Sequence, residues 1–420
     1  MSTMIEDSHV KRSLEKLLDD AHFPQRRIAF VVGPRQVGKT TLAQALLATR
    51  KAKDLYRSWD DLEWRREFVT APYGFVDASR PKVAGSRPLV VLDEIHKYPR
   101  WKRYIKGLWD TRKDRIDLLV TGSARLDVYQ RGGDSLLGRY HQYRLHPLSV
   151  REVVDPGGSS LEDVPEVTMK SLLKLAAPAP PASRKALRNL LRWGGFPEPY
   201  LEKSERQHRL WLRERRTLIV KEDLRDFTRI RMLSHVEELI ELLVIRAGGV
   251  LSYNALHEDL QVAVESVRQW TDHLQRLYFL YLIRPFAGNI ARSLRKEPKL
   301  YLWDWSEIAD DGARFENLIA NHLLKWCHFT QDWGLPPLEL HYLRDREKRE
   351  VDFLLTLSRK PWALIEAKLS DPSPGSAVSY FAERLGDPHK IQVVLECDRP
   401  GMAGDVHVID AANFLRMLPV

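Results

Sequence analysis

The sequence is poor in cysteine and has no long apolar run, and each absence excludes a class of protein. Its 420 residues include two cysteines, Cys327 and Cys397. Neither has a partner at CxxC or zinc spacing, so we expect reduced thiols and neither a disulfide framework nor a zinc site. No stretch approaches 18 uninterrupted apolar residues, and the charged N-terminus lacks the apolar core of a secretory signal. We therefore expect a cytoplasmic protein with no membrane partner.

Length and charge give weaker indications. A chain of 420 residues is too long for one hydrophobic core, so two to four domains are expected. The net charge of +9 suits a protein that follows a phosphate backbone, but it can equally serve only solubility.

Apolar runs alternate with helical patterns in the first 150 residues. Four short runs predict buried strands at 27–33, 53–58, 88–95 and 117–124, and the pattern at 39–50 is typical of a helix. This alternation predicts an α/β domain over residues 1–150, with a parallel sheet covered by helices on both faces.

A phosphate-binding loop follows the first predicted strand. GPRQVGKT at 33–40 fits G-x-x-x-x-G-K-[ST] in full and opens the predicted helix. Glycines let the backbone N–H groups turn toward phosphate, the lysine adds a charge, and the threonine hydroxyl can ligate Mg²⁺. A chance match in a glycine turn is the alternative. The predicted nucleotide-binding residues are Gly33, Pro34, Arg35, Gln36, Val37, Gly38, Lys39, Thr40 and Thr41.

An acidic pair ends the third predicted strand. We predict that Asp93 helps Thr40 to hold Mg²⁺ and that Glu94 polarises the attacking water, although two solvated acids at a strand end would look the same. Thr121 and Ser123 end the next strand, where a hydroxyl can contact the γ-phosphate or the water. Arg139 is either an arginine finger, acting within its own subunit or on a neighbouring one, or a surface arginine paired with an acid.

At this point a family resemblance is clear. The order GPRQVGKTTL, LDEI, LLVTGSA, LLGRYHQYRLHPLS and WGGFPE resembles a family of bacterial and archaeal AAA-type ATPases over almost the whole chain. The resemblance implies an ASCE-type core with an extra strand between the phosphate-loop strand and the acidic strand. It also implies the usual roles for Asp93, Glu94 and the residue around Thr121, and assembly into a homo-oligomer such as a ring.

The middle of the chain predicts a linker and then a winged helix-turn-helix. Residues 155–184 are rich in proline, glycine and serine and read as a loop within a linker and helical, lid-like region at 151–232. Three helical patterns and two β-like runs over 233–305 are typical of a winged helix. Its predicted DNA contacts are Glu265, Ser266, Arg268 and Gln269 on the third helix, and Arg292, Arg295 and Lys296 in the wing. A packing or protein-binding module is the alternative, and Glu265 is unusual for a DNA-reading position.

The C-terminal segment 306–420 predicts an α/β domain with a nuclease-like set of residues. Glu316 falls on a helix, Asp352 on a strand, and Glu366 and Lys368 on one face of the next strand. The arrangement resembles the PD-(D/E)xK restriction-endonuclease-like superfamily, although Val351 stands where that motif often has proline. It implies a second divalent metal that activates water. An exposed ion-pair cluster on a half-buried sheet is the alternative.

These features predict an ATP- and Mg²⁺-dependent hydrolase that acts on DNA, in remodelling, branch migration, repair or defence. Two other functions remain open from the sequence. One is an ATP-regulated nuclease. The other is a nucleotide-dependent switch, in which the winged helix binds protein and the nuclease-like fold is inactive.

Overall fold

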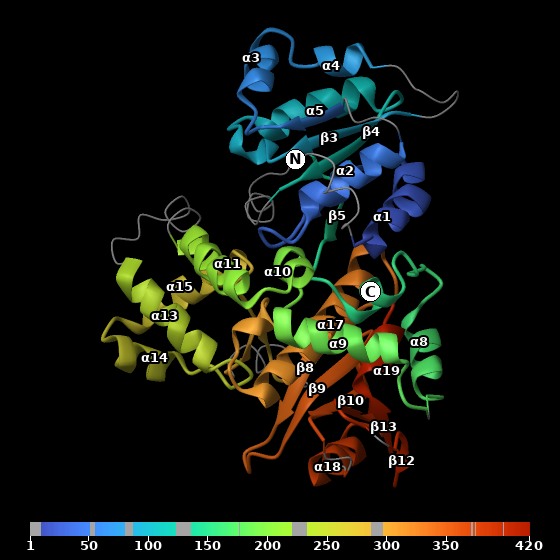
Figure 1. Ribbon diagram of the computed structural model, residues 1–420, viewed down its shortest axis with the longest axis vertical. Helices are drawn as coiled ribbons and strands as arrows, with labels where there is room; N and C mark the ends of the chain where they lie inside the picture. Colours follow the sequence, from blue (N-terminus) through green and yellow to red (C-terminus); the bar gives the residue numbers. More distant parts are fainter. Residues whose placement is uncertain are drawn as a thin grey trace. The chain divides into compact units, whose positions relative to one another are not determined.

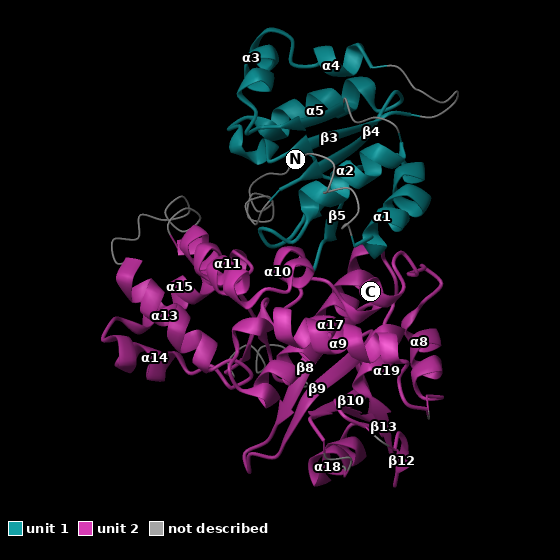
Figure 2. Cartoon of the chain, in the orientation of Figure 1, with its two compact units in different colours: residues 1–146 teal, residues 147–420 magenta. Residues whose placement is uncertain are grey.

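The computed structural model describes residues 10–50, 55–79, 87–122, 136–175, 177–220, 233–286, 297–370, 373, 375–397 and 399–420. The chain forms two compact units, residues 1–146 and 147–420 (Figure 2). The predicted end of the ATPase domain at residue 150 lies four residues beyond the first boundary. The further division at 232 and 305 stays a prediction. In the described part of the chain no helix is long and apolar enough to cross a bilayer.

The first unit is built on a five-stranded parallel sheet. The order β2-β3-β4-β1-β5 places β4 between the phosphate-loop strand β1 and the acidic strand β3, as the family resemblance implied. The strands β1, β3 and β4 are buried at every position because their residues are almost all apolar. The strands are β1 (Ile28–Val32), β2 (Tyr56–Ser58), β3 (Leu89–Asp93), β4 (Asp117–Thr121) and β5 (Tyr140–Arg144).

Helices cover both faces of this sheet. In Figure 1, α1 and α2 lie on one side of the strands, and α3, α4 and α5 lie on the other. The order of the strands requires this, because right-handed crossovers that run in opposite directions along a sheet cover opposite faces. The helices are α1 (Ser13–Leu17), η1 (Leu18–His22), η2 (Phe23–Gln25), α2 (Lys39–Thr49), α3 (Leu62–Thr70), α4 (Gly74–Asp77), η4 (Ile95–Lys97) and α5 (Trp101–Arg112).

Helices begin the second unit, where the sequence predicted a long loop. The prediction of a loop at 155–184 is wrong in part, because α8 (Pro165–Leu172) lies inside it and α9 (Pro181–Trp193) begins inside it. Each helix has a proline in its first turn, where the missing N–H costs nothing, so these prolines mark helix starts. The neighbouring helices are α7 (Val150–Val154), α10 (Pro197–Glu202) and α11 (Glu205–Leu218).

Three helices and an antiparallel hairpin follow. They are α13 (Leu233–Ile245), α14 (Tyr253–Leu260), α15 (Val264–Arg276), β6 (Leu280–Ile283) and β7 (Lys299–Leu302). The Ser252 hydroxyl accepts a hydrogen bond from the Ala255 N–H, so this residue caps α14. The order of elements is that expected for a winged helix, whose role stays a proposal.

A six-stranded mixed sheet with order β12-β13-β11-β10-β9-β8 ends the chain. Val378 and Ala382 of α18 pack on β9 and β10 through a cluster that includes Val351 and Leu364. The elements are η7 (Trp305–Glu307), α17 (Asp311–Asp332), β8 (Leu338–Arg344), β9 (Glu350–Leu357), β10 (Lys360–Lys368), α18 (Ser376–Arg384), β11 (His389–Val394), β12 (Gly401–Ala403), β13 (Val406–Asp410) and α19 (Ala411–Met417).

Candidate functional site: a phosphate loop and its acidic strand

The loop between β1 and α2 has the backbone that phosphate binding requires. Gly33, Gln36 and Gly38 have φ values of 154°, 61° and 98°, so the chain curls through conformations that favour glycine. Gly38 is the N-cap of α2 and offers no side chain to its N–H groups. These N–H groups and the positive end of the helix dipole are therefore available to an anion.

Two cations donate hydrogen bonds to carbonyl oxygens of the loop. The Lys39 ammonium donates hydrogen bonds to the carbonyl oxygens of Gly33 and Pro34, at 3.0 and 2.6 Å, so it lies within the curl of the loop. Arg12, which is 3% exposed, donates to the Val37 carbonyl oxygen at 3.0 Å and also to that of His146. Arg12 was not predicted, because an arginine before an amphipathic helix resembles any solvated residue.

Three hydroxyl groups surround the Asp93 carboxylate. Thr40 Oγ1 donates to Asp93 Oδ2 at 3.0 Å, and Tyr56 Oη donates to the same oxygen at 2.6 Å. The buried Thr121 hydroxyl donates to Asp93 Oδ1. These bonds require adjacent parallel strands, since Ser58, Asp93 and Thr121 are register partners at the carboxyl edge of the sheet. Tyr56 was missed because a lone tyrosine on a weakly apolar strand carries no motif.

Glu94 leaves the strand in a different direction from Asp93. Its φ of 55° is left-handed, and its N–H donates to the Thr121 carbonyl oxygen at 3.0 Å. A non-glycine residue with this φ is uncommon and is typical of functional sites. Burial raises the pKa of the Glu94 carboxyl, although Lys97 and Lys39 oppose the change. A carboxylate with a raised pKa is a better acceptor for the proton of a water.

The oxygen donors here fit a magnesium ion. Thr40 and Asp93 bring a hydroxyl and a carboxylate together beside the phosphate loop, and Mg²⁺ prefers one or two such ligands together with phosphate oxygens. Thr121 and Tyr56 would then orient the carboxylate from behind. The predicted contact of Thr121 with phosphate or water stays a prediction, and Ser123 lies outside the described residues.

Arg139 lies at the opposite edge of the sheet from the loop. It directly precedes β5, which is parallel to β1, and its carbonyl oxygen accepts from the N–H of Ile28 at the start of β1. A strand of five residues spans about 16 Å, which separates Arg139 from the loop within one subunit. Its guanidinium pairs with Asp110 at 2.7 Å, as the alternative of a surface arginine paired with an acid expects. The finger role, within its own subunit or toward a neighbouring one, stays a prediction.

The nuclease-like residues surround a lysine that the sequence did not single out. Lys299 Nζ lies 3.1 Å from Glu316, 2.5 Å from Glu350 and 3.8 Å from Asp352. Burial opposes the charge on Lys299, yet the three carboxylates raise its pKa above the ordinary 10.5. Burial and Asp352 raise the pKa of Glu316 to about 7. An ammonium group therefore takes the place among these acids that the sequence assigned to a metal ion.

The other predicted nuclease residues, Asp352, Glu366 and Lys368, have different partners. Asp352 accepts from the Ala367 N–H at 3.0 Å, whereas Glu366 is 5% exposed and lies against Gly375. Burial raises the pKa values of both acids, and the nearby charge of Lys368 opposes the change. Among the described residues no group of three His, Cys, Asp or Glu side chains can hold a metal ion, so the second metal has no structural support.

The predicted DNA-reading residues are placed only in part. Glu265, Arg268 and Gln269 are exposed on α15, and the Arg268 guanidinium lies 4.4 Å from the centre of the Tyr253 ring. Ser266 is half-buried on the same helix. Arg292, Arg295 and Lys296 lie outside the described residues.

Comparisons with known families divide the chain into three parts. Residues 25–154 match an AAA domain. Residues 184–307 match a domain of unknown function, DUF8612, and residues 311–414 match another, DUF4143. The nuclease-like assignment of the C-terminal segment therefore stays a proposal.

Whole-chain similarities are more distant. The uncharacterized proteins Mb2031c of Mycobacterium bovis and Rv2008c of Mycobacterium tuberculosis are each 25% identical over 366 residues, which cover 82% of this chain and 71% of theirs.

Among solved structures, the RuvB Holliday junction branch migration motor of Thermotoga maritima aligns at 18% identity over 64% of this chain and 88% of its own, with a TM-score of 0.31. A structure on katanin self-assembly aligns at 15% identity over 44% of this chain and 60% of its own, with a TM-score of 0.23. We draw no conclusion about this protein from structural similarity at this level. The family match and the five-stranded sheet with its phosphate loop support an AAA-type ATPase domain over residues 25–154.

Proposed function

We propose that the protein hydrolyses ATP with Mg²⁺ at the carboxyl edge of the five-stranded sheet. One observation carries this proposal: the end of β3 brings Asp93 and Glu94 close to the phosphate loop, and Asp93 accepts a hydrogen bond from Thr40 of the loop itself. This is the arrangement that nucleoside triphosphate hydrolysis needs, since catalysis of phosphoryl transfer consists largely of positioning and charge stabilisation.

Each residue has a distinct part in the proposed reaction. The loop N–H groups and the Lys39 ammonium bind the phosphates of the substrate. Thr40 and Asp93 would hold Mg²⁺, which when bound neutralises charge on the phosphate oxygens. Glu94 orients a water molecule toward the γ-phosphate and accepts its proton, and the left-handed φ of this residue separates its carboxylate from that of Asp93.

Direct measurement tests the proposal. Calorimetry of the full chain with ATP and Mg²⁺ should show binding in the wild type and a much weaker signal in Lys39→Ala, which removes the ammonium from the loop. Release of phosphate should accompany binding in the wild type. A wild-type protein that shows no affinity for the nucleotide would overturn the proposal.

We further propose that ATP turnover serves work on DNA, with assembly into a cytoplasmic homo-oligomer. The net charge of +9 and the exposed Arg268 and Gln269 on α15 support a nucleic-acid partner. In such an assembly Arg139 is the candidate arginine finger toward a neighbouring subunit. Remodelling, branch migration, repair and defence all fit this proposal, and ATPase assays with single-stranded, duplex and branched DNA show which form of DNA stimulates turnover.

One observation favours a second candidate function, the nucleotide-dependent switch. Because Lys299 forms ion pairs with Glu316 and Glu350 inside the acidic cluster, these carboxylates are already engaged, which suits docking better than cutting. ATP turnover that is indifferent to any DNA would support the switch. Cleavage that requires Mg²⁺ or Mn²⁺ and is lost in Asp352→Ala would instead revive the nuclease.

A further inference from the structure

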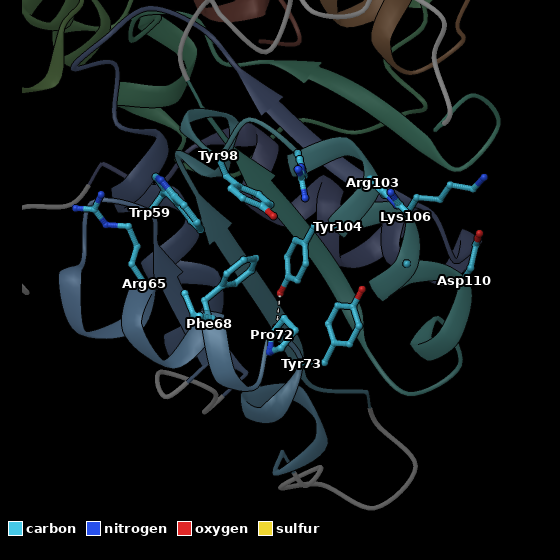
Figure 3. A pocket seen from close by; sticks show the side chains of 13 residues that line it. Trp59, Arg65, Phe68, Pro72, Tyr73, Tyr98, Arg103, Tyr104, Lys106 and Asp110 are labelled. Atoms are coloured by element: carbon cyan, nitrogen blue, oxygen red, sulfur yellow. Dashed lines mark hydrogen bonds between the residues drawn. The ribbon is translucent and has the colours of Figure 1, made fainter.

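A concave site lies on the ATPase unit, lined by residues other than those proposed to bind the nucleotide. Figure 3 shows the side chains that line this groove, which has a cavity volume of about 960 Å³. They come from the segment after β2, from α3, from the turn between α3 and α4, from the segment after η4 and from α5. The proposed ATPase mechanism uses none of them. We call this site the aromatic groove.

Aromatic rings form its floor. The rings of Trp59 and Tyr98 are 4.9 Å apart, and those of Tyr73 and Tyr104 are stacked at 5.3 Å. Phe68 and Tyr104 are buried, whereas Trp59, Tyr73 and Tyr98 are only half-buried and retain surface that a ligand can cover. Half-exposed rings of this kind offer stacking platforms to planar groups.

The rim of the groove is positively charged. Arg65, Arg100, Arg103 and Lys106 line it. In the part of the chain that the structure describes, no ion pair involves the three arginines. The one acid in the lining, Asp110, is already paired with Arg139 at 2.7 Å. The rim therefore has a surplus of positive charge, which favours a polyanion.

A ligand in the groove would be coupled to the catalytic strand. The backbone N–H of Trp59 donates to the carbonyl oxygen of Asp93 at 2.9 Å. On the other side, η4 is the whole connection between Glu94 and Tyr98. Both aromatic residues are thus attached through the backbone to the acidic pair, so a change of position at either residue reaches the water-activating carboxylate.

We propose that the aromatic groove binds single-stranded nucleic acid, with bases on the aromatic rings and phosphates on the arginines. Rings within a cationic channel suit this ligand, since every base has a face to stack and every linkage a charge. An acidic peptide supplies charge but no matching row of planar groups, and duplex hides its bases. This inference rests on the proposed function in one respect only, because it specifies the form of nucleic acid on which the proposed ATPase acts.

The test is fluorescence anisotropy of a labelled 20-residue oligothymidylate with the full chain, without ATP and in EDTA. We compare the wild type with Arg100→Ala/Arg103→Ala and with Trp59→Ala. The matched control is Arg66→Ala/Lys113→Ala, which removes two positive charges from exposed positions of the same unit outside the groove. Thermal unfolding of each variant shows whether it is folded. Trp59 also packs on Trp64 and Phe68, so Trp59→Ala can unfold the protein. In that case the result is decided by the double arginine variant.

We expect the Kd to rise about tenfold or more in Trp59→Ala, which loses a stacking ring. The logarithm of the association constant decreases linearly with the logarithm of the salt concentration. In the double arginine variant this slope should become less steep by about 1.4, since each phosphate contact on a single strand contributes about 0.7. In the control variant the salt slope should differ from that of the wild type by less than half of the change expected for the double arginine variant.

Three results would overturn the proposal: a wild type that does not bind the oligonucleotide, a control that loses as much affinity as the groove variants, or a poly-glutamate peptide that competes as well as the oligonucleotide at equal charge. The last result would make the groove a site for acidic protein. Phosphate release, measured on the same preparation without nucleic acid, reports separately on the proposed ATPase, so the two proposals can fail independently.

Discussion

The hydroxyl of Tyr56 donates a hydrogen bond of 2.6 Å to Oδ2 of Asp93, the same oxygen that the Thr40 hydroxyl contacts at 3.0 Å. Burial and the neighbouring Asp93 raise the pKa of Tyr56, so its hydroxyl stays protonated and remains a donor. This bond links the edge strand β2 to the proposed metal ligand. It therefore orients the carboxylate without contacting phosphate.

Tyr56→Phe should weaken the use of magnesium with little effect on nucleotide binding itself. Loss of a residue that orients a metal ligand typically lowers metal affinity about 10- to 100-fold. A titration of phosphate release with Mg²⁺ should show a half-saturating concentration raised by at least the lower of these factors. Tyr380→Phe in the second unit is the matched control. An unchanged Mg²⁺ titration in Tyr56→Phe would show that the hydroxyl has no such role.

Glu94→Gln should retain binding of ATP and lose turnover. A group that accepts a proton from water contributes about 10²- to 10⁴-fold to the rate, and glutamine keeps the shape but not the basicity. Single-turnover phosphate release compared with calorimetric Kd separates the two effects. Normal turnover in this variant would remove Glu94 from the mechanism.

The same carboxylate predicts the acid side of the pH profile. Glu94 must be ionised to accept a proton, and burial raises its pKa above the ordinary 4.5. The rate should therefore begin to fall at a higher pH than it would with a solvated glutamate. Profiles of kcat for the wild type and for Glu94→Gln check this, and the acid limb should be absent from the residual activity of the variant.

Gly33→Ala should damage the phosphate loop for a steric reason. A Cβ at Gly33 would lie 2.4 Å from the carbonyl oxygen of Leu145, and the N–H of Leu145 donates to Val32 at the end of β1. The strand edge cannot yield without losing that bond, so we expect a stability cost of about 1–3 kcal/mol and a loss of ATP affinity.

Gly334→Ala supplies the comparison for this variant. Gly334 also has a positive φ, of 68°, but nothing lies within 4 Å of its added Cβ. It therefore carries the conformational strain without the clash. Thermal unfolding and calorimetry measure both variants, and equal losses of stability in the two would rule out the steric explanation.

Lys299→Met should leave Glu316, Glu350 and Asp352 without their shared cation. Removing one partner of a buried ion pair costs about 3–5 kcal/mol, so the second unit should unfold at a markedly lower temperature. The pKa of Glu316 is already raised to about 7 by burial and Asp352, and it should rise further without the ammonium. A carboxyl whose folded pKa is raised favours the folded state at low pH, so the variant should regain stability as the pH falls from 8 to 5.

Lys360→Met, at an exposed position of β10, is the control for this experiment. It should unfold at the wild-type temperature at both pH values. A Lys299→Met protein that matches it throughout would show that the cluster contributes nothing to stability.

Parts of the fold were predictable because their causes are local. The strands β1, β3 and β4 are apolar runs, and the phosphate loop depends on glycines and a lysine in fixed order. Other elements lack such a signal. The sequence of β5, YHQYR, contains no apolar run, and it becomes a strand because β1 offers an edge to pair with. The strand β12, GMA, is too short to give such a signal, and β13 and α19 were also missed although both contain apolar residues.

The candidate site likewise has residues that the sequence predicted and residues that only the structure identified. By itself the sequence determined the phosphate loop and the acidic pair, since a few neighbouring residues contain that chemistry. Only the tertiary structure decided that Tyr56 and Arg12 support the site, that Arg139 lies at the far edge of the sheet, and that Lys299 occupies the acidic cluster. Each of these depends on which strands become neighbours and in which direction they run. The neighbours and directions of the strands are determined by pairing between segments that are far apart in the sequence. No short segment of the chain contains that information.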